Sequence, residues 1–297
     1  MSRPGALSLA GMLVIGSVSV SFASIFVRLA AAPALPTAAW RLAWATVIFA
    51  PFALSGPLHE LRGAARKEWR SLAVAGAALA LHFALWIASL GYTSVASSVL
   101  LVDTTPFFIG LAGQFWLGHR HGRLFWTGLA VSFLGCLVIF RDDWSRADGS
   151  MAGNFLALGG AVAMAAYLLA GGELRRKLSL LAYVWPVYGA AAVMLIAACL
   201  AAGEPLTRFP PATHLYFFLL GLVPQCIGHT TYNWSLRWLP AGLVGLITLA
   251  EPVGASILAY LLLGESLSRA KAAGGLIVLA GIYTATRSRD QAPDPRE

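Results

Sequence analysis

Charged residues are scarce in this sequence, and their scarcity excludes a soluble fold. Of the 297 residues only 11% are charged, 58% are hydrophobic, and the mean hydropathy is +0.73. A soluble domain carries about 25% charged residues, which cover its water-exposed surface. Most of this chain therefore needs a solvent other than water, and its length accommodates about ten membrane spans of ~20 residues with short loops.

The sequence signatures of common enzymes and ATP-driven machines are also missing. There is no Gly-x4-Gly-Lys-(Ser/Thr) loop for a nucleotide, no His-Glu-x-x-His and no Gly-x-Ser-x-Gly. The polar segments between the apolar runs are too short for a separate catalytic domain. We therefore expect no catalytic residues and no cofactor.

Cysteine is rare as well, and positive charge does not form an extended patch. Cys136, Cys199 and Cys226 all lie in apolar runs at spacings unrelated to metal sites, so we interpret them as buried free thiols. The net charge of +8 comes from short Lys and Arg clusters between the apolar runs. Such clusters are typical of membrane topology signals. The sequence thus predicts neither a metal site nor a nucleic-acid partner.

Ten apolar runs fill most of the chain. They cover approximately residues 7–29, 36–55, 71–90, 95–117, 123–140, 151–171, 181–202, 212–236, 241–263 and 270–286. The first is longer than the apolar core of a signal peptide, about 7–15 residues, so we expect it to be retained. The runs predict an all-α integral membrane protein with ten transmembrane helices, followed by a polar C-terminal tail at 288–297. We expect it in the plasma membrane (the bacterial inner membrane), embedded in the lipid bilayer.

The distribution of Lys and Arg predicts the orientation of the chain. With the N-terminus in the cytoplasm, fourteen of the 21 Lys and Arg residues lie in cytoplasmic segments and five in outer loops. Positive residues are enriched on the cytoplasmic side of membrane proteins. We therefore expect both termini to be cytoplasmic.

The chain also matches itself at an offset of 146 residues. The matched positions are Leu90 and Leu236, Pro106 and Pro252, Leu117-Gly118 and Leu263-Gly264, Arg123 and Arg269, Gly128 and Gly274, and Gly135 and Gly281. Because each half contains five spans, the second half must enter the membrane from the opposite side. The sequence thus predicts two inverted five-helix repeats, 1–142 and 150–287. Secondary transporters use such repeats for alternating access, with a site near the bilayer midplane.

The way each half ends resembles a known family. A proline-containing helix, then Leu-Gly-(His/Glu), then a helix that opens near Arg and carries Gly-x6-Gly is similar to the EamA family of the drug/metabolite transporter superfamily. The C-terminal copy is the clearer one, while the N-terminal copy has Gly118-His119 where the usual pair is Gly-Glu. The overall layout and the aromatic-rich interior most resemble the YddG-type exporters, which implies (aromatic) amino acids as substrates.

Polar residues at helical spacing inside the spans are candidates for a substrate site. In the first span Ser17 and Ser21 share a face, although serines also serve close helix packing. In the third span His82, Trp86 and Ser89 share a face. The eighth span carries its own polar face with Gln225, His229 and Tyr232. Trp86 and Tyr232 are equivalent under the repeat, so we expect them to line a cavity, whereas tryptophans such as Trp126 are typical lipid anchors.

Two acidic residues lie near the centre of the bilayer. Asp103 and Glu251 are each about ten residues into a span and close to an equivalent proline, Pro106 or Pro252. A charge at that depth costs at least ~2.5 kcal/mol, so each carboxyl must face a partner or water. Arg41 is a candidate partner for Asp103, and a purely structural role for the acids is the alternative. The predicted substrate-binding residues are Ser17, Ser21, Arg41, His82, Trp86, Ser89, Asp103, Thr104, Gln225, His229, Tyr232 and Glu251, with Pro106 and Pro252 as hinges.

The function that combines these features is secondary transport. We expect a monomer that moves small metabolites, foremost aromatic or hydrophobic amino acids, out of the cytoplasm by alternating access through a central cavity. The alternatives are an exporter of other amphipathic metabolites or drugs, and an intramembrane enzyme using Asp103 with His82 or His229. A sensor or channel is a further alternative. The inverted repeat argues against the enzyme, the sensor and the channel, because none of them needs it.

Overall fold

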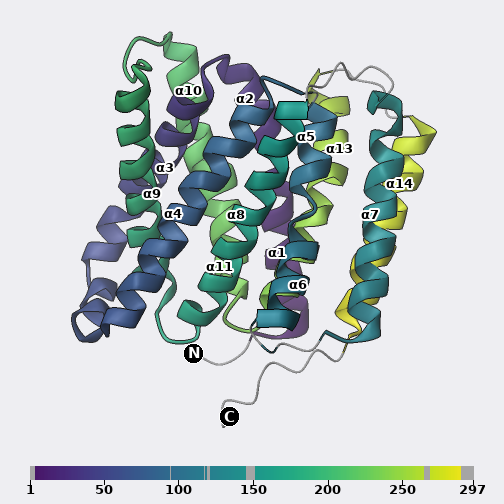
Figure 1. The fold of residues 1–297 in the computed structure, drawn as a ribbon, viewed down its shortest axis with the longest axis horizontal. Helices are drawn as coiled ribbons and strands as arrows, with labels where there is room; N and C mark the ends of the chain where they lie inside the picture. Colours follow the sequence, from purple (N-terminus) through teal and green to yellow (C-terminus); the bar gives the residue numbers. More distant parts are fainter. Residues whose placement is uncertain are drawn as a thin grey trace.

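The described part of the chain is a bundle of helices. The structure is a computed structural model that describes residues 4–93, 95–116, 118, 121–144, 151–263 and 268–288. Within these ranges all regular structure is helical, and the helices stand side by side (Figure 1). Among the described residues, seven helical segments are long and apolar enough to cross a membrane. They are Ala6–Ala30, Ala34–Leu54, Arg66–Ser89, Ser98–Phe115, Met151–Arg175, Leu180–Ala202 and Ala241–Leu262.

Each predicted apolar run is helical in the structure, but four of the runs are divided into shorter helices. In the first half the helices are α1 (Ala6–Ser21), α2 (Ala23–Ala30), α3 (Ala34–Leu54), the 3-10 helix η1 (Pro57–Gly63), α4 (Arg66–Ser89), α5 (Val95–Val102), α6 (Thr105–Trp116) and α7 (Arg123–Trp144). In the second half they are α8 (Met151–Arg175), α9 (Leu180–Ala202), α10 (Pro211–Leu220), the π-helix η2 (Gly221–His229), α11 (Thr230–Ser235), α12 (Ala241–Ile247), the 3-10 helix η3 (Thr248–Ala250), α13 (Glu251–Leu263) and α14 (Arg269–Thr286). Figure 1 shows that α1 begins and α14 ends at the same end of the bundle.

The fourth and ninth runs are interrupted at corresponding places. Pro106 is the second residue of α6 and Pro252 the second residue of α13, a position where a proline costs no helical hydrogen bond. The carbonyl of Val102, four residues before Pro106, accepts a hydrogen bond of 2.7 Å from the Thr105 hydroxyl. The prolines therefore lie at the start of the second helix of each broken pair. At Pro106, the Thr105 hydroxyl hydrogen-bonds the carbonyl that the proline leaves free.

The eighth run contains a π-helix that the sequence analysis did not predict. Pro224 lies inside η2 and has no amide hydrogen to donate to an earlier turn. The wider turn brings the Thr230 hydroxyl to 3.0 Å from the carbonyl of Gln225. Single π turns are frequent at functional sites, and this one carries Gln225 and His229.

Helices α7 and α14 form a pair at the edge of the bundle (Figure 1) and pack through the matched glycines. A Cβ atom added at Gly128 would lie 2.6 Å from the carbonyl oxygen of Gly281, and one added at Gly135 would lie 2.7 Å from that of Gly274. Only glycine allows so close an approach of two helix backbones. The two Gly-x6-Gly faces thus pack on each other, away from the centre of the bundle.

The cysteines are placed by the structure, whereas parts of the repeated motif and of the tail are not described. Cys136 and Cys199 are buried and Cys226 is half-buried, all as free thiols. His119 and Glu265 of the repeated motif lie outside the described residues, as does the predicted C-terminal tail apart from Ser288.

Candidate functional site

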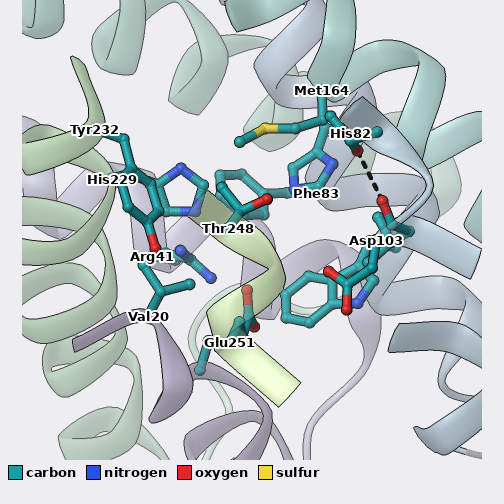
Figure 2. Close-up of a pocket in the computed structure, with 14 residues that line it drawn as sticks. Val20, Arg41, His82, Phe83, Asp103, Met164, His229, Tyr232, Thr248 and Glu251 are labelled. Carbon is teal, nitrogen blue, oxygen red and sulfur yellow. Dashed lines mark hydrogen bonds between the residues drawn. The ribbon is translucent and has the colours of Figure 1, made fainter. Parts of the chain in front are cut away.

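A small cavity lies in the middle of the bundle, between two walls of helices (Figure 2). The first wall is formed by α4, α5–α6 and α8, and the second by α1–α2, η2–α11 and η3–α13, while α3 contributes one residue, Arg41. The residues that line the cavity are Val20, Ala23, Arg41, His82, Phe83, Trp86, Val102, Asp103, Thr105, Met164, His229, Tyr232, Thr248 and Glu251. Its volume of about 40 Å³ has room for a few water molecules.

Arg41 is the cation of the cavity and is fully buried. Its Nε donates a hydrogen bond of 2.8 Å to Oε1 of Gln225, and its guanidinium lies 4.1 Å from the centre of the Phe83 ring. Its two terminal nitrogens have no hydrogen-bond partner among the described residues. The Gln225 bond and the Phe83 ring therefore fix the side chain, and two donors remain available for a ligand.

The two acids face the same hollow from opposite walls. Asp103 lies between α5 and α6, is 4% exposed, and its Oδ2 has no hydrogen-bond partner among the described residues. Glu251 begins α13 and is half-buried. In Figure 2 its carboxyl lies between Arg41 and Asp103. The expected pairing of Arg41 with Asp103 is not formed, because Arg41 bonds Gln225 through Nε while its terminal nitrogens and Oδ2 of Asp103 have no hydrogen-bond partner among the described residues.

Aromatic rings form the rest of the cavity. The rings of His82 and Trp86 are parallel within 4°, with centres 6.2 Å apart, and His229 lies edge-on to Phe83 at 5.4 Å. His82 Nδ1 lies 3.0 Å from the carbonyl of Gly160, whereas His229 Nδ1 has no hydrogen-bond partner among the described residues. The Tyr232 hydroxyl donates to Ser17 at 3.1 Å. The cavity thus combines flat apolar surfaces with unpaired polar atoms, as small-molecule sites do.

The offset of 146 residues relates several pairs of cavity residues, in addition to the pair Trp86 and Tyr232 that the sequence indicated. Four pairs of lining residues are equivalent under it: Phe83 and His229, Trp86 and Tyr232, Val102 and Thr248, and Thr105 and Glu251. Helices that the offset exchanges also pack on one another, α3 on α9 and α7 on α14. The cavity therefore lies where repeat-related segments meet.

The structure brings together seven of the twelve predicted site residues. The seven that line the cavity are Arg41, His82, Trp86, Asp103, His229, Tyr232 and Glu251. Three others contact this set from behind. Gln225 bonds Arg41, Ser17 accepts from Tyr232, and Ser21 donates to the carbonyl of Glu251 at 3.3 Å and to that of Ser17 at 2.8 Å.

Ser89 and Thr104 do not line the cavity. The Ser89 hydroxyl bonds the carbonyl of Trp86 at 2.7 Å and the hydroxyl of Ser98 at 2.5 Å, and its repeat equivalent Ser235 likewise bonds the carbonyl of Tyr232 at 2.8 Å. The Thr104 hydroxyl bonds the carbonyl of Leu101 at 2.6 Å. Both hydroxyls thus satisfy backbone groups near helix ends, a common use of Ser and Thr.

Sequence reasoning did not predict the other seven lining residues, which are Val20, Ala23, Phe83, Val102, Thr105, Met164 and Thr248. Thr105 and Thr248 lie at the interruptions of the broken helices, and the repeat offset from Glu251 would have indicated Thr105. Phe83 is the repeat equivalent of His229, which was predicted. Met164 comes from α8, whose sequence offers no polar signal near it.

A membrane-embedded helical bundle with a central cavity between repeat-related walls defines a class, the multi-pass membrane transporters. The chain belongs to the EamA-like transporter family, whose sequence profile matches residues 7–141 and 151–287. The resemblance to the EamA family is thus confirmed, and the chain is a multi-pass membrane transporter. The finer resemblance to the YddG-type exporters is not supported by the named relatives of the chain and stays a prediction.

Individual relatives of the chain are also named transporters. The uncharacterized transporter YwfM of Bacillus subtilis is 25% identical over 217 residues, 72% of each chain. The riboflavin transporter of Rhizobium johnstonii is 32% identical over 118 residues, 39% of this chain and 37% of that one. The uncharacterized inner membrane transporter YedA of Escherichia coli is 28% identical over 185 residues, 62% of this chain and 59% of its own. A solved structure titled "Crystal structure of protein" shares the fold with a TM-score of 0.80 at 19% identity, covering 95% of this chain and 97% of that one.

Proposed function

We propose that the chain is a secondary transporter that carries aromatic or hydrophobic amino acids out of the cytoplasm by alternating access. The observation that carries the proposal is the buried cavity, where Arg41 and Asp103 keep polar atoms without a partner among the described residues. Burying such atoms is costly unless a ligand or water completes their hydrogen bonds. The relatives named inner membrane transporters support a bacterial inner-membrane location.

The inverted repeat supplies the mechanism in this proposal. We assign the repeats to 1–142 and 150–287, with ten spans and both termini in the cytoplasm. The offset pairs in the cavity and the packing of α3 on α9 and of α7 on α14 support a pseudo-twofold axis through the site. Two equivalent walls around one site open in turn to either side of the membrane when one wall rocks against the other.

A cluster of hydrogen bonds holds the two walls together at the end that we assign to the cytoplasm. Asn233 of the second wall donates from Nδ2 to the hydroxyl of Tyr167 in the first wall at 2.5 Å and to that of Tyr188 in α9 at 3.1 Å. Arg175 of the first wall donates from Nε to the carbonyl of Asn233 at 3.0 Å. We call Asn233, Tyr167, Tyr188 and Arg175 the inner latch. In this mechanism the latch closes the cytoplasmic side and must break for the cavity to open there.

An amino acid suits the chemistry of the cavity. The two free donors of Arg41 match a carboxylate, which guanidinium groups bind in a bidentate manner. Asp103 and Glu251 offer acceptors for the ammonium group, and the parallel rings of His82 and Trp86 offer a flat apolar surface for the side chain. Drug-sized pockets occupy about 300–1,000 Å³, so the walls must separate before a ligand of this kind enters.

Two alternatives follow from other observations. One relative is named a riboflavin transporter, and a flat heteroaromatic ring also fits the His82 and Trp86 surface. For an intramembrane enzyme, two catalytic groups must lie within hydrogen-bond reach of each other or of one substrate atom. Among the described residues no hydrogen bond joins Asp103 to His82 or His229, and this geometry favours transport.

Transport into liposomes tests the proposal. The purified protein is reconstituted, and uptake of labelled L-phenylalanine, L-leucine and riboflavin is measured against protein-free liposomes. We expect saturable uptake of the amino acids, and uptake reduced more than tenfold by Arg41→Gln, with Arg208→Gln outside the cavity as the control. Saturable uptake of riboflavin alone would replace the amino-acid assignment, and absence of uptake for all three compounds would contradict the proposed substrates.

A further inference from the structure

The charges that face the cavity do not balance. Arg41 contributes one positive charge, while Asp103 and Glu251 contribute two carboxyls. Arg41 is fully buried and Asp103 is 4% exposed, so water screens neither of them well. Ionised groups at bilayer depth are expensive unless they are compensated. With both carboxyls ionised, the cavity would hold one uncompensated negative charge.

The positions of the groups prevent Arg41 from satisfying both acids. Its Nε bonds Gln225 and its guanidinium carbon lies over the Phe83 ring, while Oδ2 of Asp103 has no hydrogen-bond partner among the described residues. Asp103 and Glu251 line the same cavity, and like charges that share a site disfavour each other's ionisation. The second carboxyl therefore needs a further positive charge.

The other titratable groups around the acids do not supply that charge. They are His82 from α4, His229 from η2, Tyr232 from α11 and the Cys136 thiol from α7. A charged His229 would share the Phe83 ring with the guanidinium of Arg41, and His82 lies 6.5 Å from His229. A second cation there would be repelled by Arg41. Tyr232 and Cys136 carry no positive charge in either protonation state.

We infer that the cavity always carries one exchangeable positive charge, which is a proton when it is empty and the ammonium group of a cationic substrate when it is loaded. This inference rests on the proposed transport function and adds the coupling. When an organic cation enters from the cytoplasm, one carboxyl releases its proton to the cytoplasm. When the cation leaves on the other side, that carboxyl takes a proton from the outside. One cation is exchanged for one proton and no net charge moves. A zwitterion brings no net charge, so it leaves the proton in place.

Two compounds with the same ring and different net charge test the inference. Benzyltrimethylammonium is a permanent cation, which does not cross a bilayer as a neutral base, and L-phenylalanine is a zwitterion. Each is loaded into liposomes that contain the protein and a pH-sensitive dye, and the liposomes are diluted into compound-free buffer. We expect the lumen to acidify by one proton for each cation that leaves, and to show no pH change as L-phenylalanine leaves. Efflux of the cation with no acidification would overturn the inference and leave the transport function intact.

Substitution of either acid provides the second arm. In Asp103→Asn and in Glu251→Gln one carboxyl remains, and Arg41 balances it. We expect proton exchange with the cation to fall more than tenfold in both variants and to persist in Glu173→Gln, which changes an exposed acid at the end of α8. Unchanged one-to-one exchange in both cavity variants would contradict the inference.

Calorimetry of the wild-type protein in detergent tests the inference even if the variants do not fold or no flux is detected. Binding of benzyltrimethylammonium is measured in two buffers of different ionisation enthalpy. Release of about one proton per bound cation supports the inference. Binding without proton release, or no binding of the cation, overturns it, whereas failure of both compounds to move would contradict the transport function alone.

Discussion

Removing the side chain of Asn233 should loosen the inner latch and favour the state that is open to the cytoplasm. In Asn233→Ala the two hydrogen bonds from Nδ2 to the hydroxyls of Tyr167 and Tyr188 are lost, while the bond from Arg175 to the backbone carbonyl remains. All four residues are buried, so no bulk water replaces these bonds in the closed state. The substitution therefore destabilises the closed state more than an open state in which the walls are already apart.

The expected size follows from the two bonds. Side-chain hydrogen bonds between membrane helices are worth on average about 0.6 kcal/mol and at most about 1.7 kcal/mol each. Two such bonds give about 1 to 3 kcal/mol, which changes the ratio of the two states about 5- to 150-fold. Ser235→Ala is the matched control, because the Ser235 hydroxyl lies on the same helix and, among the described residues, bonds the carbonyl of Tyr232 within the second wall.

Distances between spin labels measure this ratio. Labels at Arg176→Cys and Trp238→Cys, in a background without the three native cysteines, report the separation of the walls at the end that carries the inner latch. We expect a larger population of long distances in Asn233→Ala and none of this increase in Ser235→Ala. Equal distance distributions in both variants would refute the assignment of these bonds to a latch.

Substitutions in the cavity, at the α7–α14 edge and in the π turn have different expected effects. Trp86→Ala should raise KM for transport at least fivefold, since it removes the ring that stacks on His82. Trp126→Ala should mainly lower the yield of folded protein, and uptake kinetics distinguish the two variants. Gly135→Ala should destabilise the fold by about 1–3 kcal/mol, because its Cβ would lie 2.6 Å from the amide nitrogen of Val278. Gly11→Ala is the control, because a Cβ there meets nothing within 4 Å. Thermal unfolding in detergent measures the stability of both variants. Pro224→Ala restores a backbone donor and should let η2 relax toward an α-helix, weakening the Arg41–Gln225 bond and lowering transport about tenfold with helix content unchanged by circular dichroism.

The positions of the helices were predictable because hydropathy alone determines which segments can lie in lipid. The broken fourth and ninth runs were also indicated by Pro106 and Pro252, and the structure places both prolines at the start of a new helix. The π-helix could not be predicted, because Pro224 in an apolar run is equally compatible with a kinked α-helix. Which backbone geometry compensates for a missing donor depends on the neighbouring helices.

The candidate site was predictable where burial is expensive. Three charged residues were recognised because a charge at bilayer depth must be compensated by a partner or by water. They are Arg41, Asp103 and Glu251, and all three line the cavity. Ser89 was predicted to bind substrate but does not line the cavity, because a serine hydroxyl bonds its own helix as readily as a ligand and its position on a polar face does not distinguish the two. Met164 gave no signal, since an apolar side chain in an apolar run looks the same whether it faces lipid or a cavity.

Counterflow shows whether a substrate crosses the membrane through one site that is exposed alternately to either side. Liposomes containing the protein are preloaded with unlabelled L-phenylalanine, and uptake of labelled L-phenylalanine is compared with that into empty liposomes. We predict faster initial uptake into the preloaded liposomes and transient accumulation of the label above its outside concentration, because a loaded carrier returns its site as it exchanges. Uptake that is saturable but equal in preloaded and empty liposomes, or that Arg41→Gln leaves unchanged, would contradict a single alternating site in this cavity.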